Sequence, residues 1–149
     1  MTAKWFTGMS RLFLKLIPYT FLIVWLTYHL AINISDSSAP KGIYHMTPAG
    51  KPQVGELVVM RMPMKTVAAT PGQHVRFDPT GVYVDGRLLP NSKPEPGIAR
   101  ACNYGDYVVP PEMFLGMGED NPDSWDSRYL CFLPQELIEA DAKAEVTWR

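Results

Sequence analysis

The longest apolar stretch of the chain lies near its N-terminus. No Asp, Glu, Lys or Arg occurs from Leu16 to Ile34, and a helix over this range is roughly 28 Å long, close to the ~30 Å hydrocarbon core of a bilayer. Three basic residues precede it, namely Lys4, Arg11 and Lys15. By the positive-inside rule they keep the N-terminus in the cytoplasm and send the rest of the chain across the membrane. The pattern therefore predicts a single-pass transmembrane anchor in residues 1–34 and an exported domain in residues 35–149.

A cleaved secretory signal peptide is the alternative interpretation of the same segment. The apolar run is longer than the 7–15 residues of an ordinary signal-peptide core. Small residues follow it at Ser37 and Ala39, but Pro40 comes directly after them. We therefore favour an anchor that is retained, and either interpretation places the remaining domain outside the cytoplasm.

Short apolar runs alternate with turn signals in the rest of the chain. Val82–Val84 and Arg87–Leu89 flank Asp85-Gly86, a dipeptide favoured in two-residue hairpin turns. Other strand-like runs cover residues 55–60, 65–69, 107–109, 113–115 and 146–148. Residues 137–144 are predicted as a helix from propensity alone. Many short strands with dense turns indicate a mainly β domain of about 110 residues, which is large enough to bury a core.

The composition excludes several classes of function. The 149 residues carry a net charge of −1 and are 46% hydrophobic, which argues against a disordered chain and against a bulk nucleic-acid binder. Two Cys are too few for a four-cysteine zinc site, and the three His show no metal-binding spacing. We therefore expect no metal, no cofactor and no nucleic-acid partner.

Three polar clusters carry side chains that can do chemistry. The first, residues 33–44, is rich in serine, and a serine hydroxyl needs a nearby base to act as a nucleophile. In the second, residues 64–72, Lys65 is surrounded by apolar neighbours, and desolvation lowers a lysine pKa until the amine can act as a base. In the third, residues 118–129, an Asp and an Arg can form an ion pair that fixes a loop. Each cluster alone also has an ordinary interpretation: a linker, an edge lysine that blocks aggregation, and a turn.

Taken together and in order, the three clusters resemble the conserved boxes of type I signal peptidases, which are serine proteases with a Ser–Lys dyad. The branch they resemble most is the TraF-type conjugative-transfer peptidases. The residues that match the first box are Asn33, Ser35, Ser37, Pro40, Gly42 and Tyr44. The second box is matched by Lys65 with Pro71-Gly72, and the last by Ser124-x-Asp126-Ser127-Arg128-Tyr129. Gly55–Val59 and Val82–Gly86 match two further boxes between them.

The resemblance implies a fold, an activity and a location. The implied fold is mainly β, a small signal-peptidase-like β domain with one N-terminal transmembrane helix. The implied activity is the removal of leader peptides from exported proteins, and in the TraF branch the maturation of a conjugative pilin. Hydrolysis and cyclisation of that pilin stay alternatives, because the same acyl-enzyme precedes both. The implied location is the bacterial inner membrane with the catalytic domain in the periplasm, so the partners are a precursor protein and the lipid bilayer.

The resemblance also implies the roles of the serines and the lysine. Ser37 is the implied nucleophile, and Ser38 is the alternative because TraF-type enzymes commonly show Ser-x-Pro. Lys65 is the implied general base. Ser35 is similar to the residue that helps to bind the oxyanion.

The last box carries supporting roles and two departures from the family pattern. Ser124 is similar to the serine that orients the lysine, and Asp126 and Arg128 look like the ion pair that shapes the site. Glu119 is inserted into the usual Gly-Asp-Asn sequence, and Cys131 replaces a usual glycine. The short chain has no room for the large extra domain of the housekeeping enzymes, which favours the small TraF branch.

The two cysteines are expected to pair. An exported domain lies in an oxidising compartment, where two cysteines are more often joined than free. A Cys102–Cys131 bond would close a loop of about 30 residues around the last box. The alternative is two buried thiols that never meet.

Two other functions are compatible with parts of the sequence. Ser38-x-x-Lys41 fits the Ser-x-x-Lys motif of penicillin-binding proteins, but Pro40 disfavours the helical turn that this motif requires. A non-enzymatic, anchored assembly factor of a conjugation or secretion apparatus is the second alternative. In that protein Ser37 and Lys65 would be structural only.

Overall fold

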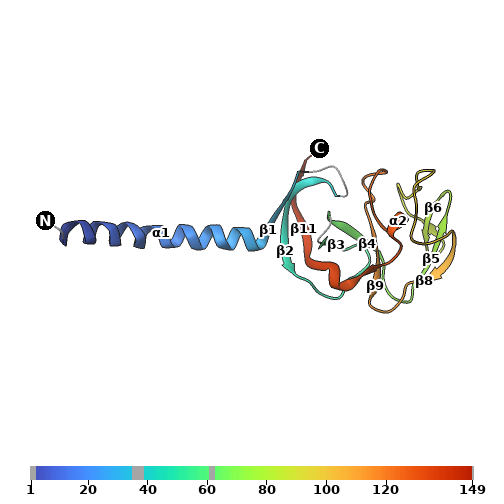
Figure 1. The fold of residues 1–149 in the computed structure, drawn as a ribbon, viewed down its shortest axis with the longest axis horizontal. Helices are drawn as coiled ribbons and strands as arrows, with labels where there is room; N and C mark the ends of the chain where they lie inside the picture. Colours follow the sequence, from blue (N-terminus) through green and yellow to red (C-terminus); the bar gives the residue numbers. More distant parts are fainter. Residues whose placement is uncertain (1–2, 35–38, 61–62, 149) are drawn as a thin grey trace.

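A long N-terminal helix projects from a body made of strands (Figure 1). The computed structural model describes residues 3–34, 39–60 and 63–148, with side chains from Leu14 onward. Helix α1 spans Ala3–His29, and strand β1 (Leu30–Asn33) follows it directly. Within the described part of the chain, no helix has both the length and the apolarity that a membrane crossing requires.

The expected helical span to Ile34 is therefore wrong at its C-terminal end. Leu30 to Asn33 leave the helix and pair antiparallel with β2 (Lys41–Pro48), in a register that places Leu30 opposite His45 and Asn33 opposite Gly42. Backbone pairing with a neighbouring strand satisfies the N–H and C=O groups that the helix would otherwise bond internally. The apolar pattern alone could not indicate that β2 would offer an edge at this place.

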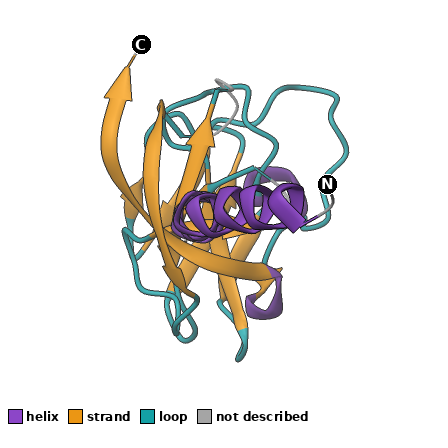
Figure 2. Cartoon of the chain, turned by 90° about the vertical axis from the view of Figure 1, so that its left-hand side faces the viewer, coloured by secondary structure: helices purple, strands orange, loops and turns teal. Residues whose placement is uncertain are grey.

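The body consists of two antiparallel sheets. Strands make up most of it (Figure 2), which confirms the mainly β prediction. The larger sheet has the order β1-β2-β11-β3-β4-β9-β10, and the smaller has the order β7-β6-β5-β8. The remaining strands of the larger sheet are β3 (Leu57–Met60), β4 (Lys65–Ala69), β9 (Met113–Met117), β10 (Leu133–Pro134) and β11 (Ile138–Trp148). The smaller sheet contains β5 (His74–Asp78), β6 (Gly81–Val84), β7 (Arg87–Leu88) and β8 (Gly105–Val108). A one-turn helix, α2 (Ser127–Leu130), and a 3-10 turn (Gln135–Leu137) complete the described elements.

The hairpin prediction is confirmed and the C-terminal helix prediction is wrong. Asp85 and Gly86 both have positive φ, +48° and +82°, as a two-residue type I′ turn between β6 and β7 requires. Residues 138–148 form the long strand β11, which pairs with β2 on one side and β3 on the other. Long-range pairing on both edges outweighs the helix propensity of a short alanine-rich stretch.

The core lies on both faces of β4 and β9. Val67 and Phe114 belong to a cluster inside the larger sheet, whereas Ala69 and Leu115 belong to a cluster shared with the smaller sheet. A register shift between Val67 and Ala69 turns the later residues of β4 to the other face. Before the shift, side chains two residues apart share a face, so Lys65 lies on the same face as Val67. The fold therefore carries the lysine into the interior of the larger sheet.

The predicted disulfide is present. Cys102 and Cys131 are joined, with their Cα atoms 5.4 Å apart. The bond connects the irregular segment before β8 to the residue that follows α2.

Candidate active site

Lys65 is a buried cation at the start of β4. Its side chain is 1% exposed, and its backbone lies opposite Val58 of β3. The Lys65 Nζ donates a hydrogen bond to Ser124 Oγ over 2.9 Å. Burial lowers the pKa of Lys65 to about 8, while the Asp126 charge raises that pKa and the Arg128 charge lowers it further. A substantial uncharged fraction is therefore present near pH 8, and an uncharged amine can take up a proton.

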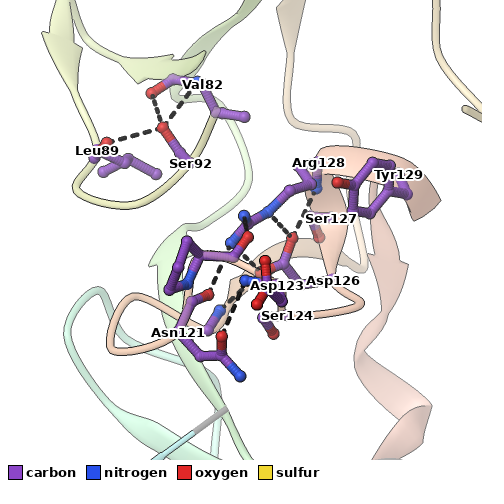
Figure 3. Close-up of polar contacts among 12 residues, drawn as sticks. Val82, Leu89, Ser92, Asn121, Asp123, Ser124, Asp126, Ser127, Arg128 and Tyr129 are labelled. Atoms are coloured by element: carbon purple, nitrogen blue, oxygen red, sulfur yellow. Dashed lines mark hydrogen bonds and ion pairs between the residues drawn. The ribbon is translucent and has the colours of Figure 1, made fainter. Parts of the chain in front are cut away.

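Asp126 and Arg128 form a buried, two-pronged ion pair (Figure 3), and the charges of both act on the Lys65 amine. Asp126 Oδ1 accepts from Arg128 Nε over 2.8 Å, and Oδ2 accepts from Arg128 Nη2 over 2.9 Å. Asp126 is 0% and Arg128 2% exposed. Two parallel bonds between guanidinium and carboxylate fix both planes as well as the distance, so the pair is a rigid support. The sequence prediction of this ion pair is confirmed.

The same two side chains hold the loop that carries Ser124. Arg128 Nη1 donates to the Pro122 carbonyl, and Nη2 donates to the Asn121 carbonyl over 3.4 Å. The backbone N–H of Gly118 donates to Asp126 Oδ2 over 2.9 Å. The loop is therefore tied at its beginning and its end, and Ser124 is presented to Lys65 from a fixed backbone.

Helix α2 is short but strongly capped. Asp126 is its N-cap residue, and its Oδ1 accepts from the Arg128 backbone N–H over 3.0 Å. Ser127 Oγ accepts from the N–H of Gly116 over 3.0 Å, which attaches the helix to β9. The sequence assigned Ser127 no role, although its place in the last box was the available signal.

Gly116 is a second residue that the sequence reasoning missed. A Cβ at this position would lie 3.0 Å from Leu133, 3.1 Å from Phe114 and 3.4 Å from the Cβ of Lys65. Glycine therefore allows β9 to approach the base of the lysine side chain closely. A glycine inside a strand, next to apolar residues, was the available signal.

The candidate nucleophile segment lies outside the described residues. This holds for Ser35, Ser37 and Ser38, so their roles stay predictions. The residues on either side are described, and they hydrogen-bond to one another. Asn33 Nδ2 donates to the carbonyls of Ala39 (2.8 Å) and Pro40 (3.2 Å), and the Tyr44 hydroxyl donates to the same Pro40 carbonyl.

Gly42 completes this arrangement because β11 passes very close to it. A Cβ at Gly42 would contact the Val146 carbonyl oxygen, so no side chain fits between the two strands. Three residues of the first box thus have structural reasons for their identity: Asn33, Gly42 and Tyr44.

The inserted residue Glu119 lies in a loop that reaches the segment before β8. Asn91 Nδ2 donates to the Glu119 carbonyl over 2.7 Å. Burial raises the pKa of the Glu119 carboxyl, and the neighbouring Asp120 charge raises it further. The N–H of Asn121 closes a turn onto the Gly118 carbonyl over 3.1 Å. A turn therefore accommodates the inserted residue, and the Asp126–Arg128 ion pair later in the same loop is still formed.

The family model described as "Signal peptidase, peptidase S26" matches residues 6–148. The chain belongs to this signal peptidase family. The match includes every candidate residue of the three polar clusters, and the family is one of serine peptidases. Its members act on proteins that carry signal peptides.

Two relatives illustrate the similarity. The chain is 34% identical over 77 residues to the "Probable signal peptidase I-2" of Synechocystis sp., a match that covers 50% of this chain and 34% of the relative. The chain thus spans about a third of the length of that curated relative. The crystal structure of a signal peptidase I from Enterococcus faecalis V583 is 24% identical, with a TM-score of 0.41, over 62% of this chain and 97% of the other.

Proposed function

We propose that this signal peptidase family member is a serine endopeptidase that removes leader peptides from exported precursor proteins, with Lys65 as its general base. The observation that carries the proposal is the buried Lys65 amine, which bonds to Ser124 and has a pKa lowered to about 8. A lysine on an exposed strand edge would keep its charge and could take no proton. Burial of the amine beside a rigid ion pair is the environment that a lysine base needs.

In the proposed reaction the nucleophile is the hydroxyl of Ser37, with Ser38 as the alternative. Uncharged Lys65 takes the hydroxyl proton as the serine oxygen attacks the scissile carbonyl. The backbone N–H of the nucleophile and the Ser35 hydroxyl stabilise the oxyanion, and each such donor is typically worth about 3–4 kcal/mol. The Lys65 ammonium then protonates the leaving amine, and water attacks the acyl-enzyme with Lys65 again as the base.

Ser124 and the Asp126–Arg128 pair act through the lysine. The hydrogen bond from Lys65 Nζ to Ser124 Oγ selects one rotamer of a long, flexible side chain. The ion pair fixes the loop from which Ser124 projects. We therefore assign these three residues to positioning of the base.

The substrate class follows from the resemblance to the TraF branch. We propose that the precursor is a conjugative pilin. The acyl group that stays on the serine is the part of the chain before the scissile bond, so cyclisation needs a cut that releases a C-terminal peptide. The pilin's own N-terminal amine then attacks that acyl-enzyme in place of water, which closes the ring and returns the proton to the serine through Lys65. Mass spectrometry separates the two outcomes, because a cyclic product is one water lighter than the linear peptide. A linear product with a free C-terminus would contradict cyclisation and leave hydrolysis as the reaction.

Membrane attachment through α1 is part of the same proposal. Large apolar side chains are exposed along this helix, among them Phe21, Ile23 and Trp25. The Cys102–Cys131 disulfide is compatible with a domain on the oxidising, periplasmic side. Extraction of membranes with alkaline carbonate should leave the full chain in the pellet, and a chain lacking residues 3–29 should appear in the supernatant.

A serine-directed acylating probe tests the enzyme against the assembly factor. The full chain should be labelled, labelling should be lost in Lys65→Ala, and it should persist in Lys51→Ala, where the lysine is exposed. Loss of labelling in Ser37→Ala, with retention in Ser38→Ala, would identify Ser37. A wild-type chain that reacts no faster than its Lys65→Ala variant would favour the non-enzymatic assembly factor.

A further inference from the structure

The helix that supports the candidate site is too short to be stable on its own. Helix α2 has four residues, Ser127–Leu130, and isolated helices need about 12–15 residues to be even marginally stable in water. Its position must therefore come from contacts with the rest of the fold. At its N-terminal end those contacts are the Asp126 cap and the Ser127–Gly116 bond.

At the C-terminal end the contacts come from the segment before β8. Residues 89–104, all of which the structure describes, contain no helix or strand. This segment meets α2 at three places. The Glu95 N–H donates to the Tyr129 hydroxyl over 2.9 Å, the Ala101 N–H donates to the Tyr129 carbonyl over 2.7 Å, and Cys102 is bonded to Cys131.

Of these three contacts only the disulfide is covalent, and it acts at the helix terminus itself. Cys131 is the C-cap residue of α2, and its N–H donates to the Ser127 carbonyl over 3.0 Å. Its φ is +66°, a conformation that costs a non-glycine residue free energy unless the surroundings hold it. The bond to Cys102 supplies a covalent constraint at that residue.

We propose that the Cys102–Cys131 disulfide is a positioning element of the candidate active site, which holds α2, and through it Ser124, against the Lys65 amine, so that the site is fully assembled only in the oxidised protein. Its catalytic consequence rests on the proposed function, whereas the positioning itself does not. Both cysteines are only partly buried, so a small dithiol reagent can reach the bond. Reduction breaks the Sγ–Sγ bond and gives two thiols; the reagent supplies two electrons and two protons and leaves as its own cyclic disulfide.

The expected direction of the effect follows from the groups around Lys65. Burial is the largest influence on the amine, and the charged groups that act on it are Asp126 and Arg128. When α2 is released at its C-terminal end, the Ser124 loop loosens and water gains access to the ammonium. Weaker desolvation stabilises the charged form, so the pKa of Lys65 should rise from about 8 toward its ordinary value of 10.5.

Titration of the Lys65 amine by NMR, with isotopically labelled lysine, measures this directly in the full chain. The variants are the Cys102→Ser/Cys131→Ser double substitution and the wild-type protein before and after reduction by dithiothreitol. We expect the pKa of Lys65 to rise by about one unit in both and to return on reoxidation of the wild type alone. At pH 8 a rise of one unit lowers the uncharged fraction, and with it kcat, about fivefold.

A matched control separates positioning from loss of stability. Ser92 lies in the same irregular segment, and its hydroxyl bonds to Val82 and Leu89 without contacting α2 (Figure 3). Ser92→Ala should lower the midpoint of thermal unfolding and leave the pKa of Lys65 unchanged. If the double variant fails to fold, the reduced wild-type chain, with its fold checked by circular dichroism, gives the same comparison.

An unchanged Lys65 pKa in folded, reduced protein would overturn the proposal and leave the disulfide with a stabilising role only. A Lys65 pKa that rises on reduction, in a protein that cleaves no precursor in either state, would support the positioning and contradict the proposed peptidase activity. The Lys65 pKa therefore tests the positioning role of the disulfide, and precursor cleavage tests the proposed peptidase activity.

Discussion

At the scale of single residues, the chemistry of the site is concentrated in one buried amine. Lys65 is 1% exposed and lies beside a neutral hydroxyl and a charge pair that is already satisfied. Burial outweighs the opposing attraction of the Asp126 charge, so the pKa of Lys65 falls from its ordinary 10.5 to about 8. Burial of the Lys65 amine thus makes it a usable base and also lowers the free energy of unfolding, because the charged form is poorly solvated.

The pH dependence of cleavage follows from that pKa. Below pH 7 Lys65 is almost entirely protonated, so kcat/KM should rise as the pH passes through about 8 and level off above it. Lys65→Arg should remain inactive at every pH, because arginine keeps its charge to a pKa above about 12. Rate profiles from pH 6 to pH 10 on a leader-peptide substrate test both; an active Lys65→Arg enzyme would contradict the role of the lysine.

The buried Lys65 amine should make the fold more stable as the pH rises. A lysine in a favourable ion pair would have a raised pKa and the opposite effect. The pKa of Lys65 is about 8 when folded, against 10.5 ordinarily, so between these values the unfolded chain binds more protons and stability rises with pH. At pH 7 the cost of charging the buried amine is fully present. Lys65→Met should remove this cost and raise the free energy of unfolding by roughly 1–3 kcal/mol after loss of the Ser124 bond. Urea unfolding at pH 7 and at pH 10.5 checks this, since the advantage should shrink at the higher pH.

At the scale of elements, local signals predicted what is local. Asp85-Gly86 predicted the β6–β7 hairpin because the turn conformation is encoded in two residues. The last box predicted the Asp126–Arg128 pair because the two residues are only two positions apart. By contrast, β11 pairs with β2, which lies about a hundred residues earlier in the chain. Strand β1 also pairs with β2, about a dozen residues later in the chain. Propensity and hydropathy could not predict those pairings.

Gly116 shows how an element's packing fixes the lysine, and it provides a test at this scale. In Gly116→Ala the new Cβ would press on Leu133, Phe114 and the base of Lys65, and overpacking of this kind typically costs about 1–3 kcal/mol. Displacement of Lys65 by a few tenths of an ångström should lower kcat by at least about tenfold with little effect on KM. Gly50→Ala is the matched control, because its Cβ would meet Asp141 at an ordinary 3.5 Å. Equal activity of the two variants would mean that close packing at Gly116 is unimportant for the base.

At the scale of the whole molecule, strands from the N-terminal and C-terminal regions flank the strand that follows the candidate nucleophile segment. Strand β2 is paired on one side with β1, from the N-terminal region, and on the other with β11, from the C-terminal region (Figure 1). The candidate nucleophile segment joins β1 to β2. The beginning of β2, where that segment ends, therefore pairs with residues at the far end of the sequence, which no motif within the first box could indicate.

The C-terminal end of β11 should accordingly be needed for activity even though it carries none of the candidate catalytic side chains. Val146, Thr147 and Trp148 pair with Ile43, Gly42 and Lys41, at the beginning of β2. Deletion of residues 146–149 would leave that end of β2 supported by β1 alone and loosen the segment that it anchors. We expect kcat/KM to fall between about tenfold and a hundredfold, the scale of a misplacement of about 1 Å, while the pKa of Lys65 stays near 8 because β4 and α2 are untouched.

Trp148→Ala is the control, since it removes a partly exposed side chain and keeps the strand. If Trp148→Ala is as impaired as the deletion, the side chain and not the strand pairing is responsible. If the deletion retains full activity, the nucleophile segment does not depend on β11.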